Sequence, residues 1–144
     1  MAINLLLVDD EEGFVTTMTK RLARRGFQVE SALSGQEALE KIKRMPLIDV
    51  VILDVKMPGM DGIETLREIK KEFPLVEVIM LTGHATVESA IEGMKLGAFD
   101  YLMKPSDLDQ LIAKIEEAKD KKLKHEQKII DAHMKEITSR KSWD

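Results

Sequence analysis

Short apolar runs alternate with longer amphipathic stretches along the chain, and the alternation repeats five times. Three of the runs are almost continuously apolar, which is typical of strands that helices cover on both faces. The run at Phe27–Ala32 instead alternates between apolar and polar residues, which favours an edge strand. The five runs are Ile3–Val8, Phe27–Ala32, Val50–Leu53, Val76–Leu81 and Phe99–Met103. Repeated strand–helix alternation predicts parallel strands joined by right-handed crossovers, and hence an α/β doubly wound domain with helices on both faces.

Signals for the beginnings and ends of helices lie between these runs. A capping box, in which an oxygen side chain caps free N–H groups and an acid reaches back, is predicted at three places. The pairs with this spacing are Ser34 with Glu37, Asp61 with Glu64 and, more weakly, Ser106 with Asp109. Gly26 and Pro74 each follow an apolar helical stripe and are expected to end it.

The chain after Asp107 has one helical pattern that continues past the end of a compact domain. A charged run over residues 119–126 separates a first apolar stripe from a second one, and its lysines are expected to form a solvated helix face. We therefore predict a domain of residues 1–121 and a helical C-terminal extension of residues 122–144. The second stripe consists of Ile129, Ile130, Met134 and Ile137. It could fold back, pair with a second chain or await a partner, and self-association or partner docking is the use we expect.

Composition narrows the class of protein. A chain of 144 residues has room for one domain, and 44% hydrophobic with 33% charged residues is ordinary for a globular protein. No apolar run approaches the roughly 20 residues of a membrane span, and the N-terminus lacks a secretory signal, so we expect a cytoplasmic protein without a membrane partner. The absence of cysteine excludes disulfides and thiolate chemistry. A net charge of −4 argues against direct nucleic-acid binding.

Polar residues follow four of the five apolar runs. Asp9 and Asp10 come after the first run, Asp54 after the third, Thr82 after the fourth and Lys104 after the fifth. Ligands of open α/β sheets bind at the carboxyl ends of the strands, so these side chains are expected to converge there. Three packed carboxylates repel one another unless a cation neutralises them, and Mg²⁺ (or Mn²⁺) suits a site with few carboxylates. Asp54 could then act as a nucleophile towards phosphorus, with Lys104 and Thr82 contacting the phosphate.

These residues also carry a resemblance to the receiver domains of two-component response regulators. The matching pieces are Val8–Glu11, Asp54–Gly62, Leu81–Gly83 and Gly97–Pro105, and the resemblance runs from Leu5 to about Ala118. The stretch Leu81–Pro105 is most similar to receivers attached to σ54-type transcription activators. The resemblance implies a flavodoxin-like five-stranded sheet of order 2-1-3-4-5. It further implies that the chain is either a stand-alone receiver or a regulatory fragment of a larger regulator.

The resemblance also implies a role for each site residue. Asp54 would receive a phosphoryl group from a histidine kinase or phosphotransfer protein, while Asp9, Asp10, Asp54 and the backbone carbonyl of Lys56 would hold the metal ion. Thr82 and Tyr101 would form a switch that changes the binding of a downstream effector protein, Lys104 would contact the phosphate, and the bond before Pro105 would be cis. Such a protein modifies itself and turns over no external substrate.

Simpler interpretations exist for single residues. Adjacent acids after a strand often form only a solvated loop, Thr82 could be a helix cap, Lys104 a surface lysine and Tyr101 a packing residue. The joint position of these residues at strand ends favours the site. The three histidines, His84, His125 and His133, are interpreted as structural or exposed, although His84 could line the site and modulate dephosphorylation.

Three other functions compete with that of a receiver. A haloacid-dehalogenase-like phosphatase would need a second acid where Lys56 stands, so we reject it. A flavin-binding electron carrier would need a phosphate-cradling loop after the first strand, where this chain has an acidic run beginning at Asp9. A transcription factor remains only if the chain is part of a longer protein, since the extension has no helix-turn-helix pattern. A homodimer through the helix of residues 107–140 is compatible with the receiver.

Overall fold

Five parallel strands form one sheet with the order β2-β1-β3-β4-β5 in this computed structural model, which describes residues 2–141. The strands are β1 (Asn4–Val8), β2 (Gln28–Ala32), β3 (Val50–Leu53), β4 (Glu77–Thr82) and β5 (Asp100–Met103). Each lies within one residue of the strand that the hydrophobic pattern predicts. The expected doubly wound sheet and its strand order are confirmed.

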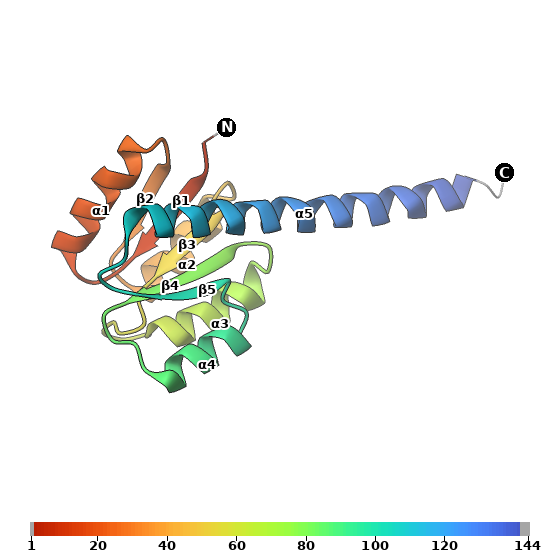
Figure 1. Ribbon diagram of the computed structural model, residues 1–144. Helices are drawn as coiled ribbons and strands as arrows, with labels where there is room; N and C mark the ends of the chain where they lie inside the picture. Colours follow the sequence, from red (N-terminus) through yellow and green to blue (C-terminus); the bar gives the residue numbers. More distant parts are fainter. Residues whose placement is uncertain (1, 142–144) are drawn as a thin grey trace.

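Helices cover both faces of the sheet (Figure 1). They are α1 (Glu12–Arg24), α2 (Gly35–Arg44), α3 (Gly62–Glu72), α4 (Val87–Lys95) and α5 (Leu108–Lys141). Leu5 and Leu7 of β1 point towards α1 and α5 and belong to one core cluster, whereas Leu6 and Val8 point towards α2 and α3 and belong to the other. This alternation explains why the central strands are apolar throughout: both of their faces are buried.

Two of the three predicted helix caps form. The Glu37 amide donates to Ser34 Oγ at 3.2 Å at the start of α2, and the Glu64 amide donates to Asp61 Oδ1 at 2.9 Å at the start of α3. The prediction for Ser106 with Asp109 is wrong. Because α5 begins one residue after Asp107, the Asp109 amide donates to Asp107 Oδ1 at 3.3 Å instead. The structure adds a capping box at α4, between Thr86 and Ser89, that the sequence analysis did not single out.

Helix α5 continues past the sheet as a single helix of 34 residues, about 50 Å long (Figure 1). Its first turns are buried in the core through Leu111, Ile115 and Ala118. Four large apolar side chains of the extension that follows are exposed: Leu123, Ile129, Ile130 and Met134 are each 50–56% exposed, whereas Ile137 is half-buried. The residues after 141 in the predicted extension lie outside the described part of the chain.

The interpretation of the lysine run at the start of the extension as a solvated face is wrong for Lys119 and Lys122, whereas Lys121 is half exposed. Lys119 Nζ and Lys122 Nζ donate to Asp49 Oδ1 at 2.7 and 2.9 Å, and Lys121 Nζ lies 3.3 Å from Glu77 Oε2. These lysines reach back to acids at the amino ends of β3 and β4. These ion pairs attach α5 to the domain as far as Lys122, and the boundary after residue 121 stays a prediction.

Within residues 2–141, none of the helices combines the length and the apolar character that crossing a membrane requires.

Candidate functional site

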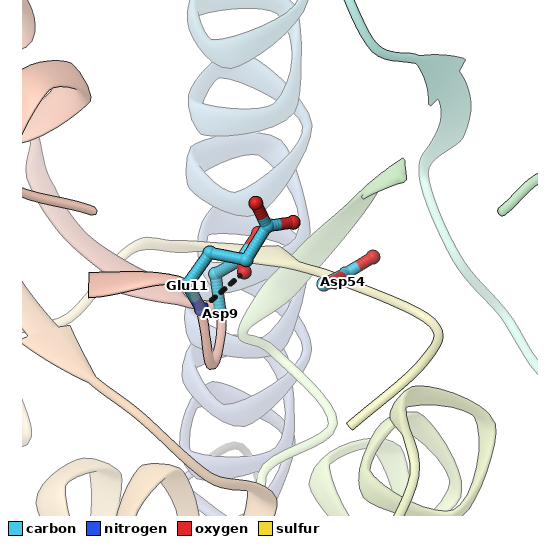
Figure 2. A group of neighbouring side chains, drawn as sticks. All are labelled: Asp9, Glu11 and Asp54. Carbon is cyan, nitrogen blue, oxygen red and sulfur yellow. Dashed lines mark hydrogen bonds between the residues drawn. The ribbon is translucent and has the colours of Figure 1, made fainter. Parts of the chain in front are cut away.

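Three carboxylates gather at the carboxyl-end edge of the sheet (Figure 2). Asp9 directly follows β1, Asp54 directly follows β3, and Glu11 precedes α1 by one residue. One oxygen from each lies within 4.8 Å of an oxygen from the other two. Asp9 and Asp54 are almost completely buried, with 1% and 2% of their surface exposed, whereas the Glu11 side chain is 63% exposed. The group therefore has a buried floor and one side open to solvent.

Backbone contacts fix the two buried aspartates. The Asp9 amide donates to the Ala32 carbonyl at 3.1 Å, so the residue continues the sheet beyond β1. Asp9 Oδ1 accepts from the Glu11 amide at 3.0 Å, and Asp54 Oδ1 accepts from the amide of Val55 at 2.8 Å. These bonds leave one oxygen of each side chain for other partners.

Gly62, the first residue of α3, lies directly against the backbone of Asp54. A Cβ atom at Gly62 would be 1.9 Å from the Asp54 carbonyl oxygen and 2.7 Å from the Val55 Cα, and no real Cβ approaches so closely. The Gly62 amide donates to the Val55 carbonyl at 2.7 Å. The glycine thus allows α3 to begin against the end of β3, which fixes the loop that carries Asp54.

Lys104 is the cation of the site. Its Nζ donates to Asp9 Oδ2 at 2.6 Å, lies 3.6 Å from Glu11 Oε1 and stands 3.9 Å above the centre of the Phe14 ring. Burial alone would lower the pKa of Lys104, but the hydrogen bond and charge of Asp9, with the charges of Asp54 and Glu11, raise it above its ordinary value. Lys104 is therefore charged at neutral pH. The peptide bond between Lys104 and Pro105 is cis.

The negative charge around Asp54 is not fully balanced by nearby positive charge. Burial raises its pKa most, and the charge of Asp9 raises it further, while hydrogen bonding by Thr82 and the charge of Lys104 act in the opposite direction without reversing the shift. One ammonium faces three carboxylates here, so the group carries an excess of negative charge. Its exclusively oxygen donors fit a hard divalent cation such as Mg²⁺.

Asp10 and Lys56 border this group without joining it. Among the described residues the carboxylate group contains Asp9, Glu11 and Asp54, whereas the exposed Asp10 lies outside it. Asp10 and Lys56 do line a shallow hollow together with Glu11 and His84. The metal-binding roles of Asp10 and of the Lys56 carbonyl stay predictions. Glu11 joins the group although no role was expected for it, and its place in the acidic run after β1 was the available signal.

Thr82 and Tyr101 complete the set of predicted residues. Thr82 ends β4, is fully buried, and its Oγ accepts from the His84 amide at 3.0 Å. Tyr101 lies on β5, and its hydroxyl is 2.6 Å from Ser89 Oγ on α4. His84 is exposed at the edge of the hollow, and His125 and His133 are exposed on α5, as expected for residues outside a metal site.

Comparison with known proteins agrees with this geometry. The family model described as response regulator receiver domain matches residues 5–116. The transcriptional regulatory protein ZraR of Escherichia coli O157:H7 is 42% identical over 137 residues, which are 95% of this chain and 30% of that protein. The chain thus spans less than a third of the length of this curated relative.

Solved structures of similar sequence have the same fold. A response regulator receiver domain protein from Clostridium thermocellum is 40% identical, with a TM-score of 0.80 over 83% of this chain and 96% of that one. NtrX from Brucella abortus is 34% identical, with a TM-score of 0.80 over 90% of this chain and 30% of NtrX. A matching family model over most of the chain, together with these likenesses, leads to one conclusion: the chain belongs to the response regulator receiver domain family of two-component signalling.

Proposed function

We propose that Asp54 accepts a phosphoryl group from a histidine kinase or phosphotransfer protein, and that the modified domain changes its binding to an effector. The observation that supports this most is the position of Asp54: it is buried, its pKa is raised, and it stands among carboxylates that one lysine does not neutralise. An Asp54 carboxylate oxygen would form a bond to phosphorus as the bond from phosphorus to the donor breaks, with its electron pair leaving on the donor.

The residues around Asp54 suit the roles that this proposal gives them. Asp9, Asp54 and either Glu11 or Asp10, with the Lys56 carbonyl, would hold Mg²⁺, which when bound neutralises charge on the phosphoryl oxygens. Lys104 lies within reach of the same region and can exchange its contact with Asp9 for one with a phosphoryl oxygen. Thr82 acts on Asp54 in the direction that lowers its pKa, so its hydroxyl is close enough to follow a phosphoryl group there.

An output surface is proposed on α4 and β5. Large apolar side chains on this side of the molecule are exposed: Val87 76%, Ile91 52%, Met94 47% and Met103 64%. Tyr101 lies between α4 and the sheet, and a change in its position would change this surface. We propose that an effector protein, or a module attached to the same polypeptide, binds there, and that the chain modifies itself without turning over an external substrate.

The proposal is tested by measuring the intact mass of the chain after incubation with Mg²⁺ and acetyl phosphate. The native chain is expected to gain one phosphoryl group when Mg²⁺ is present and none when EDTA replaces it. Asp54→Asn is expected to gain none, while the control Asp131→Asn, on the exposed extension, behaves as the native chain. A folded native chain that gains no phosphoryl group would contradict the proposal, and so would an adduct that persists in Asp54→Asn.

We also propose a homodimer through the extension of α5, because the apolar residues of the extension have the spacing of paired helices. Leu123, Ile130 and Ile137 are seven residues apart, and Met134 lies between the last two on the same side of the helix. Leu123, Ile130 and Met134 are at least half exposed in the single chain. Sedimentation of the full chain and of residues 1–126 tests it, since this cut keeps Lys122 on Asp49. Equal oligomeric states at equal concentration would contradict the dimer.

A further inference from the structure

The hydroxyl of Tyr101 is bound to helix α4 through one side chain. Tyr101 Oη and Ser89 Oγ are 2.6 Å apart, and the pair joins β5 to the first turn of α4. The tyrosine ring also lies against α4 at Gly93, where an added Cβ would be 3.6 Å from the ring carbon Cδ2. The ring therefore packs on α4 at one end and is hydrogen-bonded to α4 at the other.

Ser89 itself is held by the capping box of α4. The Ser89 amide donates to Thr86 Oγ1 at 3.0 Å, and the Thr86 amide donates to Ser89 Oγ at 3.2 Å. Ser89 Oγ is also 3.1 Å from the Thr86 carbonyl oxygen, which can only accept. Ser89 Oγ also lies 3.0 Å from Thr86 Oγ1. A serine hydroxyl has one hydrogen to give, and when Ser89 donates it to the Thr86 carbonyl, Tyr101 donates to Ser89 Oγ.

This network is connected to the phosphoryl-accepting site by a short loop. Thr86 follows Thr82 by four residues, and Thr82 Oγ accepts from the His84 amide at 3.0 Å within that loop. If Thr82 moves to follow a phosphoryl group on Asp54, the oxygen that accepts from the His84 amide moves with it. The loop that begins at Thr82 ends at the residue that caps α4, so a change at Thr82 reaches Ser89 through the backbone.

We propose that Ser89 is a positioning residue that holds Tyr101 against α4 and opposes movement of the ring towards Thr82; this inference rests on the switch role of Tyr101 in the proposed function. Because Ser89 is fixed by the helix cap, the ring can move only by breaking the bond or by carrying the start of α4 with it. The position of Tyr101 and the surface of α4 are in this way coupled through one hydroxyl group.

Loss of that hydroxyl has a predictable effect on the ring. One hydrogen bond changes the ratio of two populations by roughly five-fold, so Ser89→Ala should shift Tyr101 towards its alternative position by that factor. Ser89→Thr keeps a hydroxyl and should restore the native ratio. Thr86→Ala removes the side chain that caps α4 and its contact with Ser89 Oγ, but it keeps the Thr86 backbone contacts of Ser89 and leaves the Ser89 hydroxyl for Tyr101. It therefore tests the stability of the helix start with the contact to the ring still in place.

Fluorine NMR can follow the ring directly, because Tyr101 is the only tyrosine of the chain. The full chain labelled with 3-fluorotyrosine gives one resonance, and native chain treated with Mg²⁺ and acetyl phosphate gives the reference for the switched position. Without a phosphodonor, Ser89→Ala is expected to move the resonance towards this reference, while Thr86→Ala and Ser89→Thr stay near the native value. An unchanged resonance in Ser89→Ala, or an equal shift in Thr86→Ala, would overturn the role of Ser89.

Failure of the proposed function would look different. If intact mass finds no phosphoryl group on the native chain, the reference is lost and the function fails, but the contrast between Ser89→Ala and Thr86→Ala still decides whether Ser89 holds the ring. If the native chain is phosphorylated and the Ser89→Ala resonance stays at the native value, the function stands and the inference about Ser89 falls.

Discussion

Buried acids lie at both edges of the sheet, and the two edges differ in how many cations accompany them. At the carboxyl-end edge, Asp9, Glu11 and Asp54 share a single ammonium group, that of Lys104. At the amino-end edge, Asp49 directly precedes β3 and Glu77 is the first residue of β4. They are 3% and 1% exposed. The lysines that contact these two acids are Lys70, Lys119, Lys121 and Lys122.

The pKa values of the two central aspartates shift in opposite directions as a result. Burial raises the pKa of both. At Asp54 the raise persists, because Asp9 adds to it and the hydrogen bond from Thr82 and the charge of Lys104 do not overcome it. At Asp49 hydrogen bonds from Lys119, from the Asn4 amide and from Lys122 outweigh burial and lower the pKa below its ordinary value. The same residue type in equally buried places thus carries an unsatisfied charge at one edge and a satisfied charge at the other.

The difference separates a structural acid from a reactive one. Asp49 and Glu77 use their charge to attach the start of the α5 extension to two strands, and nothing is left over for a ligand. Asp54 keeps a charge that a cation or a phosphoryl group can still relieve. A surplus of carboxylates over cations, rather than burial alone, therefore marks the edge at which chemistry is expected.

The largest effect on stability is expected from Asp49→Asn. The substitution leaves Lys119 and Lys122, which are 26% and 12% exposed, without their shared carboxylate. We expect a loss of about 2–3 kcal/mol in the free energy of unfolding, near the lower end of the cost of breaking a buried pair because Lys119 keeps some access to water. Urea denaturation followed by circular dichroism measures it.

Asp131→Asn serves as the control for this experiment, since Asp131 contacts only Gln127 on the exposed extension. A loss at Asp49 no larger than that of the control would mean that the amino-end edge is not held by its charges. Acetyl phosphate should still modify Asp49→Asn, because Asp54 lies at the opposite edge of the sheet.

Acid should weaken the same contact. An acid with a lowered pKa in the folded state contributes stability that is complete above the unfolded value of 3.8 and is lost as the pH falls below it towards the folded value. The difference in unfolding free energy between the native chain and Asp49→Asn should therefore be constant from pH 7 to about pH 5. Below 3.8 the difference should shrink. A difference that stays unchanged at lower pH would show that the charge of Asp49 is not what stabilises the fold.

Asp54→Asn should increase the free energy of unfolding, by less than Asp49→Asn decreases it. Its pKa is raised, so the folded state holds the charged form against burial and against Asp9, and removing the charge relieves that cost. In EDTA at pH 7 we expect a gain of about 1 kcal/mol in unfolding free energy. Mg²⁺ should stabilise the native chain more than Asp54→Asn. A loss of stability in EDTA would mean that Lys104 already neutralises the site.

The sequence predicts the strands and the residues at the carboxyl-end edge of the sheet. It does not predict the contacts that the helices make with the sheet. Asp9, Asp54 and Lys104 each follow a strand directly and Thr82 is the last residue of one, so parallel pairing alone brings them to one edge. The contacts of Lys119 with Asp49 and of Tyr101 with Ser89 depend on where a helix crosses the sheet and on side-chain direction. Neither follows from periodicity. Glu77, a charged residue inside an apolar strand, was an overlooked signal, as was Glu11 in the acidic run after β1.

The lysines of the amino-end edge should differ from one another, and one of them should give the smallest effect of all. Lys121 is 50% exposed and lies 3.3 Å from Glu77 Oε2, while Lys70, 19% exposed, also contacts Glu77 at 3.3 Å. Lys121→Ala therefore leaves Glu77 with a partner and removes only a solvent-screened pair, so a loss of about 0.5 kcal/mol or less is expected. Lys122→Ala should cost about 1–2 kcal/mol because that ammonium is more deeply buried against Asp49. Urea denaturation of the two variants under identical conditions compares them. Equal losses would indicate that both lysines act through helix packing, since a charge contact must weaken as its exposure to water rises.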